Sequence, residues 1–233
     1  MLKGVVADLR LLVAMAASVL TAVAQRDVTK FLGIPVDGTK AEMRRKLIAK
    51  GFTPTKLPGC DFLEGEFNGE KVQVFVATNN NRVCRICLCD ERLRDEANIR
   101  IRFNNLLTQF DNNSRYLSFG NNLIPEDENI SYGMTVKNKV YEACFYQAPQ
   151  WERGDTLAFQ QHVREELLKV YTEQELGNPT DEIAKGIASR SFELTKEVIV
   201  KKSVWFRICA VNGQYSIAMY YDNEYNRANG EDL

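Results

Sequence analysis

The chain has 233 residues, of which 45% are hydrophobic, and 30 basic and 31 acidic residues leave a formal net charge of −1. This length and apolar fraction allow a buried core, as one domain or two small ones. The near-neutral balance, with no basic stripe, argues against nucleic acid as a partner.

The first 24 residues carry the pattern of an export signal. Lys3 and Arg10 accompany the apolar run LLVAMAASVLTAVA, which ends in an Ala-Val-Ala triplet at 22–24 that suits signal peptidase. The run is shorter than the ~20 residues that cross a bilayer as a helix, which argues against a permanent anchor. We therefore predict a signal peptide over 1–24 and a single α+β globular domain over 25–233. The protein is expected to be exported, periplasmic or secreted, with no transmembrane span in the mature chain.

The stretch GIPVDGTKAEMRRKLIAKGF, residues 33–52, differs from a phosphate-binding loop by the order of Thr39 and Lys40. That loop needs its lysine directly after the second glycine and a buried strand before the first, and neither is present. Thr39 and Glu42 instead form a T-x-x-E capping box. The stretch predicts a helix that begins at Lys40 and ends before Gly51, and not a nucleotide site.

Three β-rich segments follow, at 60–67, 71–78 and 82–89. Asn68-Gly69 is a two-residue hairpin signal, and the sequence NNNR forms the next turn, so these segments predict an antiparallel meander. Apolar residues then recur at helical spacing through DEANIRIRFNNLLTQFDNN, which predicts a helix that returns across the sheet. The segment 118–133 is rich in Gly, Asn and Pro and is predicted to be a loop.

The second half of the chain repeats this order of helices and hairpins. The predicted elements are a strand at 139–147, a long amphipathic helix at 156–177, a shorter helix from Asp181, and strands at 192–200, 204–211 and 215–222. Grouped strands indicate an α+β fold with an antiparallel sheet packed against amphipathic helices. The two halves echo each other, with a boundary near 113–130, although residue identity is too low to claim a duplication.

All six cysteines lie after the predicted signal peptide, at positions 60, 84, 87, 89, 144 and 209. An even number in an exported protein is compatible with disulfides. Most of them, however, stand in β-rich runs, where cysteine behaves as a small buried hydrophobe. Cys87 and Cys89 point to one side of their strand and Cys84 to the other, which is a poor tetrahedral cage. The settings favour buried thiols over disulfides, and both over a metal site.

Candidates for catalysis are few. His162 is the only histidine, and no orienting motif surrounds it. The acidic clusters at 125–129 and 221–226 lack the order of a calcium loop, and Glu126 and Glu128 are neighbours in one loop and not carboxylates that face each other across a cleft. We therefore predict no catalytic residue, no cofactor and no metal.

The sequence QYSIAMYYDNEYN is the best candidate for a contact surface. Tyrosines beside Asn and Asp suit recognition of a protein or a glycan, because the ring buries area while the hydroxyl keeps a polar partner. We name Tyr220, Tyr221 and Tyr225 as this surface. The competing interpretation is a half-buried aromatic strand, which β-propensity alone favours.

The segments FLGIPVDGTKAEMRRKLIAKGF and NGQYSIAMYYDNEYNRANGEDL resemble a group of uncharacterised exported proteins of Bacteroidetes bacteria. The first helix with the strands after it is also similar to the helix-plus-sheet modules of beta-lactamase inhibitory proteins and outer-membrane assembly lipoproteins. The first resemblance implies an envelope or secreted protein with no assigned activity, and it provides no catalytic residues to carry over.

These observations predict a non-catalytic envelope or secreted protein that binds a protein or glycan partner. The alternative is an unrecognised periplasmic hydrolase. A deep cleft with converging polar side chains would favour the enzyme, whereas a flat sheet covered by helices would favour the binding module.

Overall fold

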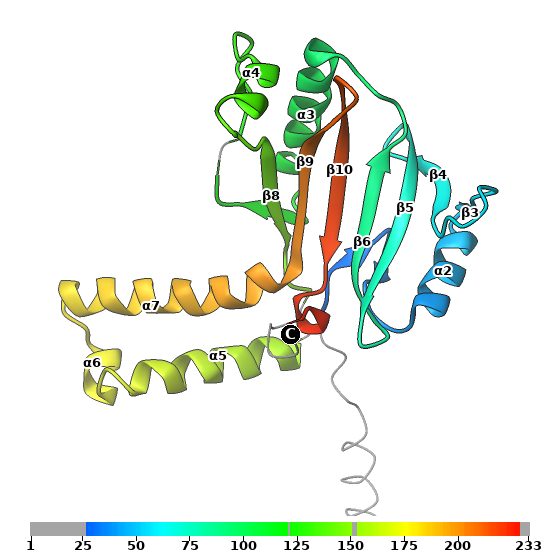
Figure 1. The fold of residues 1–233 in the computed structure, drawn as a ribbon. Coiled ribbons are helices and arrows are strands. Elements are labelled where there is room, and N and C mark those ends of the chain that lie inside the picture. The colour runs from blue at the N-terminus through cyan, green and yellow to red at the C-terminus, as the bar shows by residue number, and fades with distance from the viewer. Residues whose placement is uncertain (1–26, 121, 151–152, 229–233) are drawn as a thin grey trace, which may run out of the picture.

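A computed structural model describes residues 27–120, 122–150 and 153–228 (Figure 1). The predicted signal peptide over 1–24 lies outside these residues. The fold is α+β, as the sequence predicts, with an eight-stranded antiparallel sheet and several helices (Figure 1).

The sheet has the strand order β3-β4-β5-β6-β10-β9-β8-β7. Its strands are β3 (Thr53–Pro54), β4 (Leu63–Phe67), β5 (Glu70–Asn79), β6 (Arg82–Asp90), β7 (Tyr116–Ser118), β8 (Glu142–Gln147), β9 (Ser203–Val211) and β10 (Gln214–Asp222). A separate hairpin comprises β1 (Lys30–Phe31) and β2 (Ile34–Pro35). The helices are α2 (Lys40–Ala49), α3 (Glu96–Asp111), α4 (Ile130–Thr135), α5 (Arg153–Leu168), α6 (Glu173–Gly177) and α7 (Asp181–Ile199), with 3-10 turns at Val200–Lys202 and Glu224–Asn226.

Two four-stranded meanders make up this sheet. Strands β3 to β6 form the first and β7 to β10 the second, and the last strand of each, β6 and β10, pair at the centre. A helix precedes each meander, α2 the first and α3 the second. The chain passes from the first meander to the second between β6 and α3.

Three hairpins form at the predicted turns. Asn68 and Asn212, each followed by glycine, have φ of 54° and 50°, and Asn80 and Asn81 also have positive φ. Asparagine and glycine tolerate this left-handed backbone better than other residues, and the right-handed twist of paired strands requires it in a two-residue turn.

One face of the sheet holds the core. Alternate strand residues such as Val74, Ile86 and Met219 are buried against α2, α3 and the β1–β2 hairpin. Phe206 is fully buried in a group of aromatic rings, with its ring centroid 5.0 Å from that of Phe103. Burial of one face only explains why strand side chains alternate between buried and partly exposed.

The helix α2 begins and ends as predicted. The Thr39 side chain accepts a hydrogen bond from the Glu42 amide, and the Glu42 carboxylate accepts one from the Thr39 amide, which completes the capping box. Gly51 has φ of 102°, and the Phe52 amide donates to the Leu47 carbonyl. Residues 33–52 therefore form a turn and a capped helix.

Replacing Thr39 by alanine is expected to lower the free energy of unfolding by about 1 kcal/mol, because the Glu42 amide loses its acceptor and the Glu42 carboxylate loses the Thr39 hydroxyl. Urea denaturation of both proteins measures this cost. The same cost is expected with and without MgATP. A stabilisation by MgATP that the wild type shows and the variant lacks would instead indicate a nucleotide site.

The prediction of a strand at 192–200 is wrong. Helix α7 runs through this segment to Ile199, and Thr195 donates its hydroxyl to the Ser191 carbonyl within the helix. Leu194 and Ile199 are the buried residues of this helix. The β-branched composition suggested a strand, but the apolar spacing that begins at Ile183 continues with helical period.

Two further boundaries differ from the prediction. The predicted helix at 156–177 is interrupted after Leu168, and Thr172 and Glu175 form a second capping box that starts α6. The predicted loop at 118–133 contains the start of α4, capped by Asn129. Both errors arise because a short capped helix has too few residues to show a period.

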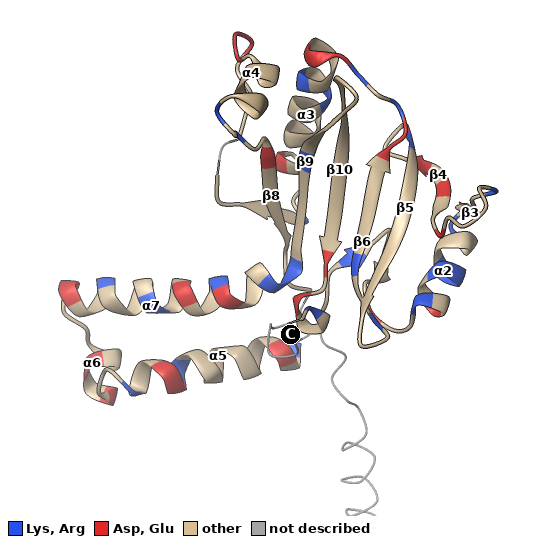
Figure 2. Cartoon of the chain, viewed as in Figure 1, with Lys and Arg blue, Asp and Glu red and all other residues tan. Residues whose placement is uncertain are grey.

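Helices α5 and α7 lie antiparallel and extend beyond the sheet as an arm (Figure 1). Basic and acidic residues are interspersed along both helices (Figure 2). Among the described residues, no helix combines the length and the hydropathy needed to cross a membrane.

Candidate functional site

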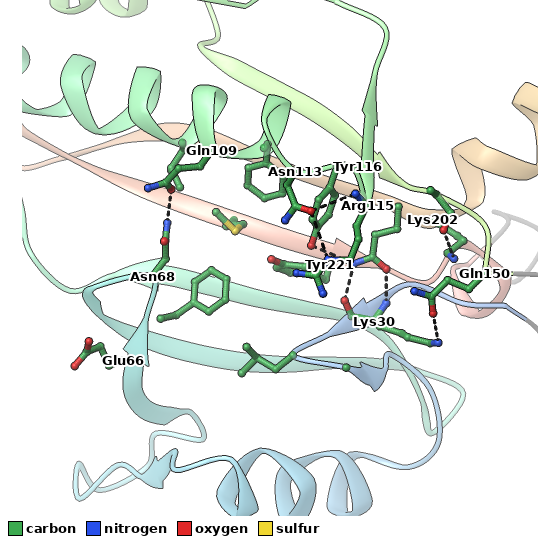
Figure 3. Close-up of a pocket in the computed structure, with 18 residues that line it drawn as sticks. Lys30, Glu66, Asn68, Gln109, Asn113, Arg115, Tyr116, Gln150, Lys202 and Tyr221 are labelled. Atoms are coloured by element: carbon green, nitrogen blue, oxygen red, sulfur yellow. Dashed lines mark hydrogen bonds between the residues drawn. The ribbon is translucent and has the colours of Figure 1, made fainter.

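A cleft lies between the sheet, the end of α3 and the β1–β2 hairpin (Figure 3). Its volume of about 830 Å³ falls within the range of small-molecule sites. Segments far apart in the sequence line it, because the hairpin, β4, α3, β7, β8 and β10 converge on the core face of the sheet. Its polar lining consists of Lys30, Glu66, Asn68, Gln109, Asn113, Arg115, Tyr116, Gln147, Gln150, Lys202 and Tyr221.

Gln147 joins the hairpin to the sheet at one end of the cleft. Its side-chain oxygen accepts from the Lys30 amide at 2.7 Å, and its side-chain nitrogen donates to the Lys30 carbonyl at 2.7 Å. The Lys30 ammonium donates to the Gln150 side chain at 2.8 Å. The hairpin is therefore held in place by side-chain amides, which fixes the position of the Lys30 ammonium.

A second amide pair closes the other end (Figure 3). Asn68, in the β4–β5 turn, donates to the Gln109 side chain of α3 at 2.6 Å. Both residues are exposed and keep further donor and acceptor capacity. The cleft therefore presents side-chain amides at both ends. Asn68 and Gln109, which form this second pair, are 41 residues apart in the sequence.

Three cations line the cleft, and they differ in environment. Lys202 has only 3% of its side chain exposed and donates to the Asp27 carboxylate at 2.8 Å and to the Ala148 carbonyl at 3.3 Å. Burial lowers the pKa of Lys202, and the hydrogen bond to Asp27 opposes this shift. Arg115 is exposed, and its nearest side-chain acceptor is Asn113 at 3.4 Å. Arg115 and Lys30 therefore remain the cations best placed to meet a ligand.

The lining limits the chemistry that this cleft supports. Among the described residues that line it, Glu66 is the one carboxylate and is exposed, and none is a histidine, cysteine or serine. Acid–base hydrolysis needs two groups that exchange protons within hydrogen-bond reach of the substrate, or a nucleophile with its base. The lining groups instead donate and accept hydrogen bonds and carry positive charge.

The structure does not bring the three named tyrosines together on one surface. Tyr221 is 3% exposed and lines the cleft, and its ring is tilted against that of Phe31 with the centroids 4.9 Å apart. Burial raises the pKa of Tyr221 well above the usual value. Tyr220 lies on the opposite face against Trp205, at 4.0 Å. Tyr225, beyond the strand end, is 36% exposed and faces the Lys201 ammonium.

The other sequence candidates lie outside the cleft. His162 is exposed on α5, and Glu126 is exposed in the loop before α4. In the two acidic clusters, Glu128 pairs with the Lys139 ammonium and Asp222 pairs with Arg85. All six cysteines, each within the described residues, are free thiols.

No protein-family model matches this chain, and comparison with curated proteins and with solved structures finds no match either. The candidate site therefore stands on its own geometry. No motif in the sequence marks this site, because its polar residues are scattered over separate segments of the chain from Lys30 to Tyr221. The clusters of asparagine and glutamine at strand and helix ends were the only signal that could have suggested it.

Proposed function

We propose that this chain is a non-catalytic binding protein of the bacterial envelope or the secreted fraction, and that the cleft binds an acidic glycan. The observation that carries the proposal is the lining, where side-chain amides and cations converge and carboxylates are nearly absent. Export rests on the leader pattern at 1–24.

An acidic glycan matches each part of this lining. Side-chain amides form paired hydrogen bonds with sugar hydroxyls, since each amide offers both donors and an acceptor. The partly buried Tyr116 ring offers a flat surface with a polar tip. Lys30 and Arg115 supply charge-assisted hydrogen bonds to a carboxylate on the sugar.

A cleft is the feature that would favour the alternative function, a periplasmic hydrolase. Its lining argues the other way, because one exposed carboxylate, Glu66, is not an acid–base pair. Lys202 is the buried cation of the lining, and its ammonium is engaged by Asp27 and Ala148.

Calorimetric titration of the purified protein with a uronic-acid oligosaccharide and with a neutral glucan of equal length tests the proposal. We expect binding of the acidic sugar only. Arg115→Gln and Lys30→Gln should each weaken it about 10- to 100-fold, because each removes a charge-assisted hydrogen bond worth roughly 1.5–3 kcal/mol.

The matched control is Arg45→Gln, which removes the same charge from an exposed position of α2 outside the cleft. It should leave affinity unchanged. Equal loss in Arg45→Gln and Arg115→Gln would show nonspecific attraction and contradict the cleft as the site. Hydrolysis of the oligosaccharide during the titration would support the enzyme instead.

A further inference from the structure

The sheet face opposite the core carries a cluster of sulfur and aromatic groups. Cys87 on β6 stands directly across from Phe75 on β5 and from Tyr220 on β10. Tyr220 in turn stands across from Trp205 on β9, and the two rings stack at 4.0 Å. Helices α2 and α3 pack on the other face of the sheet, and these side chains are only partly buried.

Two thiols meet in this cluster. Cys87 and Cys89 occupy alternate positions of β6, so their side chains leave the strand on the same face. Their sulfur atoms lie 3.9 Å apart. Because a metal–thiolate bond measures about 2.3 Å, two such bonds span up to about 4.6 Å, and one ion between the sulfurs can reach both.

A cation lies close to this pair. Arg85 stands two positions before Cys87 on β6, and its guanidinium is 5.0 Å from the centre of the Tyr220 ring, which lies across from Cys87. Thiolate is the form of cysteine that binds metals, and a nearby positive charge favours it.

We propose that Cys87 and Cys89 form a two-thiolate site for a soft monovalent cation of the Cu(I) and Ag(I) class. The described residues contain no group of three or more histidine, cysteine or carboxylate side chains that could hold a metal, so the pair does not complete a tetrahedral zinc site. Thiolates select soft cations, which accept low coordination numbers.

Charge and proton balance are consistent with this assignment. Binding replaces both S–H bonds with sulfur–metal bonds and releases up to two protons to solvent, with no change of oxidation state. The resulting complex carries one negative charge, which Arg85 partly offsets. The Arg85 guanidinium lies over the Tyr220 and Trp205 rings, 5.0 and 5.4 Å from their centres.

Competition for Cu(I) tests the proposal. Reduced protein carrying Cys60→Ser, which removes the exposed thiol, is titrated without oxygen against a bicinchoninate–Cu(I) complex. We expect one equivalent of Cu(I) to transfer to the protein. Cys87→Ser or Cys89→Ser should each weaken binding at least about 100-fold, because a single remaining thiolate loses the advantage of two linked ligands.

The matched control is Cys144→Ser, since Cys144 is a half-buried thiol on β8, across from Trp205. It should bind one equivalent with unchanged affinity. In a Trp151→Phe background Trp205 is the only tryptophan of the sequence. Cu(I) should then change the fluorescence of Trp205 in the Cys144→Ser control but not in Cys87→Ser. Circular dichroism confirms that each variant is folded. No transfer to the wild-type pair, or equal affinity in the folded Cys87→Ser and Cys144→Ser variants, would overturn the proposal.

Discussion

Replacing Asp90 by asparagine is expected to destabilise the protein by about 3–5 kcal/mol, the cost of leaving buried charges without their partner. The Asp90 carboxylate accepts from Arg94 and from Arg102, each at 3.1 Å. Both guanidinium groups are nearly buried, with 6% and 10% of the side chain exposed. Arg94 retains an ion pair with Glu70, but Arg102 depends on Asp90. Urea denaturation with linear extrapolation measures the loss.

Asp61 provides a matched control, because it also contacts two cations. It pairs with Lys40 at 2.6 Å and with Arg44 at 2.7 Å, yet 58% of its side chain is exposed. Asp61→Asn should cost less than about 1 kcal/mol, since water screens an exposed pair. Similar costs for the two variants would show that burial does not set the strength of the Asp90 cluster.

Replacing Phe206 by alanine is expected to cost about 3–5 kcal/mol, because it removes a large ring from a packed core and leaves a cavity. The Phe206 ring is fully buried between Phe103, Phe110 and Phe145, at centroid distances of 5.0, 5.7 and 6.1 Å. These neighbours come from α3 and β8, so the cavity would loosen the packing of helix on sheet.

Phe192→Ala is the control for ring loss outside the core. Phe192 on α7 is 55% exposed and contacts the Phe119 ring at 6.4 Å. We expect it to cost less than about 1.5 kcal/mol, the range of one aromatic pair. Thermal and urea unfolding of both variants give the comparison. A Phe206 variant no less stable than the Phe192 variant would contradict the central place of Phe206 in the core.

The proposed glycan site and the proposed cation site use opposite faces of the same sheet. Tyr221 lines the cleft, and the adjacent Tyr220 lies beside Cys87 on the other face. Successive residues of a strand point to opposite sides. For this reason neighbouring tyrosines in the sequence could not form one contact surface.

Local signals in the sequence determined the fold class, the hairpins and the helix starts. These signals act between residues a few positions apart, because sterics and hydrogen bonds within one turn set the backbone conformation. Examples are the Asn68-Gly69 turn, the Thr39 capping box and the positive φ of Gly51. The prediction of buried thiols in this run was less accurate, because Cys87 is only partly buried between the buried Ile86 and Leu88.

Only the tertiary structure decided which strands pair and where the cleft lies. Ile86 of β6 pairs with Tyr221 of β10, and Lys30 bonds to Gln147 at the cleft. In each contact the two residues are more than a hundred positions apart in the sequence. Such pairs leave no periodic trace in the sequence, because their stability comes from packing and from cross-strand hydrogen bonds that exist only in the assembled sheet. The α7 segment is a different case, because its helical apolar spacing from Ile183 onward is present in the sequence and the β-branched residues concealed it.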